Sequence, residues 1–387
     1  MTNLWESLKS IIRESKNLGL LGITIYSASL ISGLFFLYIA PLLGPEKYGE
    51  LSYLYSISNI IFALCFFGGG SIILIYIPKG VKIFPVIGII SLFSCFIGSV
   101  IAFIFLNDFV ISLLILSLSI SNLATNELLA KQQYKSYSKY IFTQRISFVV
   151  LSIGLYHVFD ISGLLLGIGL SNLFFIPRII FSFKESKIDF SLIKPRFKFM
   201  LNNYALWITR VGYGYMDRLI ISPIHGFEIL GNYELAGQIV AFMYIFPIVI
   251  HSFVQPRDAK KISTRKVKTG AIILSVLFAV LVSILAPIIL PLLFDEFSTS
   301  IMFVSIMAFA IIPHMISRLN ASRFLGNEMS KIVIIGSGLH LGVLILGIIV
   351  LGGQFGTMGL AISFLLSEIT EAVFLSLMHK RTFKIFV

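Results

Sequence analysis

Twelve long apolar stretches follow one another along this chain of 387 residues. A helix needs about 20 mainly apolar residues to cross the hydrocarbon core of a membrane, and each stretch reaches that length. Apolar residues make up 57% of the sequence and charged residues only 12%, so the chain lacks the charges that a water-facing surface requires. The sequence therefore predicts a membrane protein in which most residues lie in spanning helices.

The predicted fold is all-α and polytopic, with about twelve membrane-spanning helices. In the first half we expect spans at 18–43, 50–77, 81–106, 109–130, 138–159 and 161–183. In the second half we expect spans at 198–223, 229–255, 269–294, 298–324, 330–352 and 355–379.

The connecting loops alternate in charge along the chain. Of the 30 Lys and Arg residues, 24 lie at the chain ends and in every second loop, whereas the intervening loops contain one, Lys47. Because Lys and Arg concentrate in cytoplasmic loops, the pattern places both termini in the cytoplasm. The net charge of +12 thereby has a topological explanation, and a nucleic-acid partner is excluded.

Two turns with the pattern G-x-E-x-x-G occur 182 positions apart, from Gly44 to Gly49 and from Gly226 to Gly231. Both fall at predicted outer connections. Two weaker matches follow in the same order, at offsets of 188 and 196. Together they predict two pseudo-symmetric lobes of six helices each, related by an axis along the membrane normal.

The chain is accordingly expected to divide into five segments. The expected boundaries are an interfacial amphipathic helix at 1–17, an N-terminal lobe at 18–183, a basic cytoplasmic linker at 184–197, a C-terminal lobe at 198–379 and a cytoplasmic tail at 380–387.

Five arginines lie inside predicted spans, where a charge is costly and often functional. Arg210 lies near the middle of its span, and Arg145 and Arg318 are the next hardest to explain, so these three are candidates to line a substrate cavity or to form structural pairs. Arg178 lies near a cytoplasmic end and can reach water. Arg218 adjoins Asp217, which indicates either an interfacial pair or a ligand site.

Acidic and amide side chains supply the other candidates. Glu368 and Glu371 are one helical turn apart and share a face, so they can pair with an arginine or carry a proton or Na⁺. Glu127 is a further candidate for ion coupling. Polar stripes in spans 4 and 7 predict faces on a wet cavity, and their secondary candidates for contacting sugar are Asn122, Asn203 and Trp207.

The sequence contains no pattern of an enzyme or of a metal or cofactor site. It lacks H-E-x-x-H, a Walker loop and a Cys/His cluster, and its two cysteines, Cys65 and Cys95, lie in apolar runs. The predicted outer loops do not exceed about ten residues, which leaves little room for the outer domain of a glycan polymerase. We therefore expect a secondary transporter or flippase that needs no cofactor.

Three segments resemble the polysaccharide-export flippases. The first outer turn and span 2 read PLLGPEKYGELSYLYSISNIIFALCFFGGG, and span 9 with its exit reads LAPIILPLLFDEFSTS. The most specific segment, MDRLIISPIHGFEILGNYELAGQIVAFMYIFPIVIHSFVQP, combines Asp217-Arg218, the second G-x-E-x-x-G turn, a following Y-x-x-A and a distal Pro256. One departure is that Ala40 to Leu43 lack the arginine that many relatives carry before the first turn.

The chain thus resembles the O-antigen (Wzx-type) flippases of the multidrug/oligosaccharidyl-lipid/polysaccharide exporter superfamily. The resemblance implies that an undecaprenyl-diphosphate-linked oligosaccharide crosses from the cytoplasmic to the outer leaflet of the inner membrane by alternating access. It also implies the lipid bilayer, a polysaccharide polymerase and a chain-length regulator as partners. Two alternatives stay open: a cation-coupled multidrug antiporter of the same superfamily, and a membrane glycan polymerase.

Overall fold

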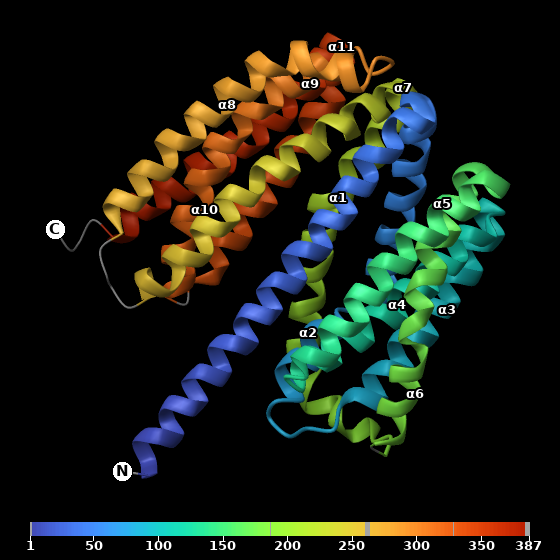
Figure 1. The fold of residues 1–387 in the computed structure, drawn as a ribbon, viewed down its shortest axis with the longest axis vertical. Helices are drawn as coiled ribbons and strands as arrows, with labels where there is room; N and C mark the ends of the chain where they lie inside the picture. Colours follow the sequence, from blue (N-terminus) through green and yellow to red (C-terminus); the bar gives the residue numbers. More distant parts are fainter. Residues whose placement is uncertain (1, 186, 260–263, 328, 384–387) are drawn as a thin grey trace. The chain divides into compact units, whose positions relative to one another are not determined.

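The structure is a computed structural model that describes residues 2–185, 187–259, 264–327 and 329–383, and every regular element in these ranges is helical (Figure 1). Within these ranges, eight helices are long and apolar enough to cross a membrane, so the chain is a multi-pass membrane protein. The α-helices are α1 (Thr2–Cys65), α2 (Gly69–Tyr76), α3 (Phe84–Leu106), α4 (Phe109–Ala130), α5 (Tyr134–Asn172), α6 (Ile176–Lys184), α7 (Phe197–Ala259), α8 (Arg265–Leu293), α9 (Ser300–Met307), α10 (Ile311–Gly326) and α11 (Ser330–Phe383).

Four of the eight candidate spans are much longer than one crossing requires. They contain 45 to 53 residues each, or roughly 70–80 Å of helix against about 30 Å of hydrocarbon. Each contains one residue with non-helical backbone angles, namely Gly44, Asp160, Gly226 and Gly356. Gly44, Asp160 and Gly226 fall in predicted connections between successive spans, whereas Gly356 lies at the beginning of the predicted span 355–379.

The predicted span at 50–77 is interrupted, which the sequence pattern did not indicate. Helix α1 ends at Cys65, Phe67 and Gly68 have φ angles of 50° and 64°, and α2 begins at Gly69. Such angles suit glycine, and the Gly68–Gly70 run is a weak helix former. A Cβ on Gly68 would lie 3.2 Å from the Cα of Tyr204, so a side chain would also crowd α7 there.

The chain forms two compact units. The first contains the residues up to Phe35 together with Ile57–Val211, and α4 contacts α2, α3, α5 and α6 within it. Its interior includes Leu114, Leu123 and Phe148, all almost fully buried.

The second unit contains Phe36–Ser56 and the residues from Gly212 onward. Its core is formed by apolar residues of α7, α8, α9, α10 and α11, among them Ile221, Tyr233 and Phe303. This grouping differs from the predicted lobes at two places, since 36–56 belongs with the second unit and 198–211 with the first. A division based on chain order cannot foresee that a helix passes from one unit to the other.

The N-terminal segment continues straight into the first span. Helix α1 runs from Thr2 without a break until Gly44, whereas the sequence indicated a separate short helix at 1–17. The side chains of residues 1–18 lie outside the described part of the structure, so the amphipathic face of that segment stays a prediction.

Candidate functional site

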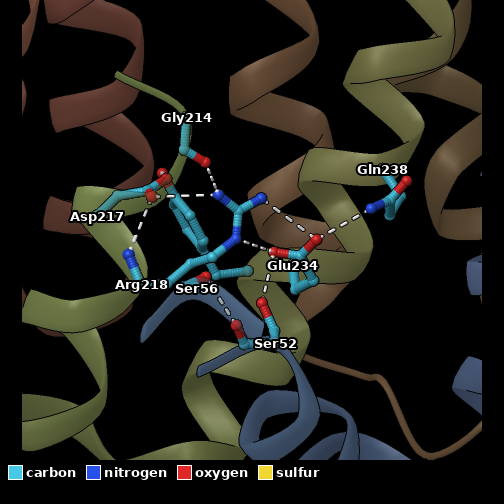
Figure 2. Close-up of polar contacts among 8 residues, drawn as sticks. Ser52, Ser56, Gly214, Asp217, Arg218, Glu234 and Gln238 are labelled. Atoms are coloured by element: carbon cyan, nitrogen blue, oxygen red, sulfur yellow. Dashed lines mark hydrogen bonds and ion pairs between the residues drawn. The ribbon is translucent and has the colours of Figure 1, made fainter. Parts of the chain in front are cut away.

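Arg218 is the centre of a buried polar network in the second unit (Figure 2). Its Nε donates to Oε2 of Glu234 at 2.6 Å, and its Nη2 donates to Oε1 of the same carboxylate at 3.3 Å. Its Nη1 donates to the carbonyl of Gly214 and lies 3.4 Å from Oδ1 of Asp217. This two-pronged contact makes Glu234 the main partner of the guanidinium.

The two carboxylates differ in how they are satisfied. Glu234 also accepts from Ser52 Oγ at 3.0 Å and from Gln238 Nε2 at 3.0 Å, so it has four donors. Asp217 accepts from Tyr233 Oη at 3.0 Å and from the Arg218 amide at 2.9 Å. Glu234 is therefore well stabilised as an anion. Asp217 is stabilised less, because its ion pair with Arg218 is longer, at 3.4 Å, than that of Glu234, at 2.6 Å.

The turn at Gly226 explains how this network forms. Gly226 has a φ of 85°, which breaks α7 so that Arg218 and Glu234 lie on two limbs of one helix. Close packing of α1 against α7 then brings in Ser52. A Cβ on Gly49 would collide with the Phe227 carbonyl, and one on Gly231 would collide with the Pro45 carbonyl. We call segments 44–52 of α1 and 217–234 of α7 together the outer contact, because both glycine turns are predicted at outer connections.

A second polar network in the same unit surrounds Glu368, which is fully buried. Tyr213 and Tyr244 donate to its Oε1 at 3.1 and 2.9 Å, and His314 Nδ1 lies 3.1 Å from Oε2. Arg318 Nε donates to His314 Nε2 at 3.2 Å. Because Nε2 accepts from Arg318, Nδ1 is the ring nitrogen that can donate to Glu368.

His340 and Glu371 extend this network along α11. Ser337 donates to Glu371 Oε1 at 3.0 Å, and His340 Nδ1 lies 3.9 Å from Glu371 Oε2. That nitrogen is buried and has no hydrogen-bond partner among the described residues. Ligand atoms of His340, Glu368 and Glu371 all lie within 4.8 Å of one another, so the three side chains can hold a proton or a small cation.

The first unit contains a separate ion-pair cluster around Glu127, which is fully buried. Arg178 donates to both of its oxygens at 2.7 Å, and Lys131 Nζ lies 2.5 Å from Oε1 and also contacts Glu185. The interpretation that Arg178 only reaches toward water is therefore wrong, because this side chain is 10% exposed and pairs with α4. Glu127 has enough cations around it to act as a structural anchor between α4 and α6.

The three arginines predicted to line a cavity differ in exposure and in the unit to which they belong. Arg318 is exposed on α10 and contacts the Glu368 network through His314. Arg145 is half-buried on α5 in the first unit. Arg210 belongs to α7, but its side chain lies outside the described part of the structure, so its role stays a prediction.

The secondary candidates of the first unit make mostly local contacts. Asn122 and Asn203 donate to carbonyls of their own helices, those of Leu118 and Phe199, at 3.0 and 2.9 Å. The Trp207 ring contacts Phe62 and Phe66, with ring centroids 6.2 Å apart in both cases. The sugar-binding role of the three residues stays a prediction.

Sequence reasoning missed several members of the two networks. The six histidines appeared scattered, yet His314 contacts Glu368 from 54 positions away, and His340 offers a ligand atom within 4.8 Å of those of Glu368 and Glu371. Only the spacing of His314 and Arg318, one helical turn apart, gave a local signal. Ser52 was missed as well, although it follows the first G-x-E-x-x-G pattern closely.

Comparisons with known proteins identify the fold. No protein-family model matches the chain, and no curated protein matches it by sequence. The solved structure of the lipid II flippase MurJ in an inward closed conformation has a TM-score of 0.74 at 12% identity, over 93% of this chain and 87% of that chain. An inward-facing multidrug-resistance MATE transporter of the MOP superfamily has a TM-score of 0.71 at 14% identity, over 95% of this chain and 98% of that one.

An outward-facing structure of a MATE family transporter has a TM-score of 0.58 at 13% identity, over 97% of this chain and 96% of that one. At such identities the similarity establishes the MOP-type fold and leaves the substrate undetermined, since one fold serves many functions. The matched proteins are transporters, and none of the three is an enzyme.

Proposed function

We propose that this chain is a flippase that moves a polyprenyl-diphosphate-linked oligosaccharide from the cytoplasmic to the outer leaflet by alternating access. The observation that carries the proposal is the MOP-type fold, shared over nearly the whole chain with the lipid II flippase MurJ. The sequence segments that resemble O-antigen flippases point to the same class of substrate. The chain would act in the cytoplasmic membrane beside the enzymes that polymerise the glycan.

The proposed topology has twelve spans in two halves of six, with both termini in the cytoplasm. Four long helices, each divided once by a non-helical residue, supply eight of these spans. The remaining four come from single helices at α3, α4, α8 and the α9–α10 pair. The charge alternation of the loops supports the orientation.

The substrate head carries a diphosphate, which needs cations to enter a low-dielectric cavity. Arg145, Arg210 and Arg318 are the proposed partners, because the planar guanidinium binds phosphate oxygens with two hydrogen bonds and stays charged. Among them, Arg318 is exposed and donates a hydrogen bond to His314. It can therefore contact a ligand while His314 connects it to Glu368.

The Glu368 network is the proposed site of ion coupling. Glu368, Glu371 and His340 combine two buried carboxylates with a buried imidazole nitrogen that lacks a hydrogen-bond partner among the described residues. Binding of a proton or a small cation there would neutralise charge, and Arg318 links the same network to the substrate. A cation-coupled multidrug antiporter is the second candidate function, because a buried acidic site also suits that activity and the fold is shared with a MATE transporter.

Complementation distinguishes the two functions. Cells that lack this gene should accumulate lipid-linked oligosaccharide on the cytoplasmic side and lose surface polysaccharide if the flippase proposal is right. Arg210→Ala should lose most of the complementation and Arg210→Lys should recover part of it, with Arg257→Ala as the control outside the spans. Normal surface polysaccharide in the deletion, with raised sensitivity to cationic drugs, would favour the antiporter.

A further inference from the structure

The outer contact contains one more buried negative charge than positive charges. Asp217 and Glu234 are 7% and 6% exposed, and one cation, Arg218, pairs with both of them. An uncompensated buried charge is strongly unfavourable, so a second positive charge is favoured at this place. A proton is the smallest cation that can supply it.

Geometry indicates which carboxylate takes the proton. Glu234 has four donors, including the two-pronged contact from Arg218, and has no need of another. Asp217 Oδ1 is 3.4 Å from Arg218 Nη1, and its Oδ2 accepts from Tyr233 Oη at 3.0 Å, a contact in which the hydroxyl oxygen can accept once Oδ2 carries a proton. A proton on Oδ2 therefore keeps a hydrogen bond with Tyr233.

A second observation at the outer contact concerns Tyr48, whose buried hydroxyl has unused hydrogen-bonding capacity among the described residues. Its side chain is 1% exposed, and its hydroxyl has no hydrogen-bond partner among the described residues. It lies within electrostatic range of Glu234 and Arg218, at the end of the first G-x-E-x-x-G turn. The other titratable groups that face the network are Tyr215 and Tyr233 on α7 and Tyr55 on α1.

We propose that Asp217 binds an exchangeable proton that holds the outer contact closed. When Asp217 is neutral, Glu234 alone of the two carboxylates forms an ion pair with Arg218, and Glu234 also accepts a hydrogen bond from Ser52 across the contact. When the O–H bond of Asp217 breaks and the proton passes to water on the outer side, the new carboxylate competes for Arg218. The ion pair between Arg218 and Glu234 then weakens, and the hydrogen bond from Ser52 to Glu234 weakens with it. The proposal rests on the alternating-access function, for which an outer contact between the halves must open.

The experiment measures how fast a cysteine beneath the contact reacts with a membrane-impermeant maleimide. Ser56 is fully buried and lies one turn after Ser52 on α1, so Ser56→Cys in a Cys65→Ala/Cys95→Ala background is the reporter. Rates in membranes at several outer pH values are divided by rates for the same protein unfolded at the same pH, which removes the pH dependence of the thiol itself.

In the parent, the proposal predicts normalised labelling that rises between pH 6 and pH 8 by up to about tenfold per pH unit, since one proton released on opening changes the free energy by about 1.4 kcal/mol per unit. Asp217→Asn should label slowly at both pH values, and Glu234→Gln should label fast at both. Asp217→Glu should restore the pH response, and Glu228→Gln, an exposed acid on the same turn, should behave like the parent.

Labelling of the parent that does not change with pH would overturn the proposal, as would an unchanged pH response in Asp217→Asn. Because no substrate is present, the assay gives its answer even if the chain transports something other than a lipid-linked saccharide. Conversely, a failure to transport that saccharide would leave the labelling result intact. Size-exclusion profiles of each variant identify any that fails to fold, and the Asp217→Glu variant then carries the test.

Discussion

Ser52 donates a hydrogen bond of 3.0 Å to Glu234, and these two residues are 182 positions apart. The same offset separates the two G-x-E-x-x-G turns, at Gly44–Gly49 and Gly226–Gly231. Gly49 packs against the Phe227 carbonyl while Gly231 packs against the Pro45 carbonyl, and 45 and 227 are again equivalent positions. Such reciprocal contacts are those expected near a pseudo-two-fold axis that relates two halves of one chain.

Replacing Gly49 or Gly231 by alanine should destabilise the second unit. The added methyl would meet a backbone carbonyl that cannot move easily, and overpacking of this kind costs about 1–3 kcal/mol. Gly237→Ala is the matched control, because it lies in the same helix and a Cβ there meets nothing within 4 Å. The midpoint of thermal unfolding in detergent should fall for the first two variants and stay level or rise for the third.

Removing Arg178 should leave the buried carboxylate of Glu127, in the first unit, without its main partner. Arg178→Ala leaves Glu127 with Lys131 alone, and breaking a buried pair from one side costs about 3–5 kcal/mol. Arg178→Ala combined with Glu127→Ala should cost less than the sum of the single variants. Additive losses in this double-mutant cycle, measured as unfolding midpoints, would contradict the anchor role of Glu127.

Ion coupling should depend on the three side chains around Glu368. Glu371→Gln and His340→Ala each remove a possible ligand while the hydrogen bonds from Tyr213 and Tyr244 remain, so folding should survive. We expect transport driven by a cation gradient to fall by about tenfold or more. His157→Ala, an exposed histidine of α5, serves as the control and should keep the activity of the parent.

The break between α1 and α2 should tolerate no side chain at Gly68. Its φ of 64° and the 3.2 Å approach to Tyr204 both oppose a Cβ, so Gly68→Ala should cost about 1–2 kcal/mol. Gly22→Ala is the reference, since it lies in α1 with open space around it. Equal unfolding midpoints for the two variants would show that the break is not needed for stability.

The sequence predicted the helices well because long apolar runs and charged ends determine which residues can enter a membrane. The turns at Gly44 and Gly226 were visible as repeated glycine patterns. The break at Phe67–Gly68 was not predicted, because the apolar run continues through it and only the glycine run signals it. The partners of Glu368 were not predicted either, since His314, His340 and Tyr213 lie far apart in the chain and meet only through tertiary packing.

Flipping by the purified protein in vesicles tests the central claim most directly. The vesicles carry a polyprenyl-diphosphate-linked oligosaccharide, and the measurement is how much becomes accessible to a lectin added on the other side over time. The account predicts that accessibility increases with the protein, and that Arg318→Ala slows the increase. Accessibility that stays at the protein-free level, while the same vesicles move a cationic dye, would contradict the flippase function.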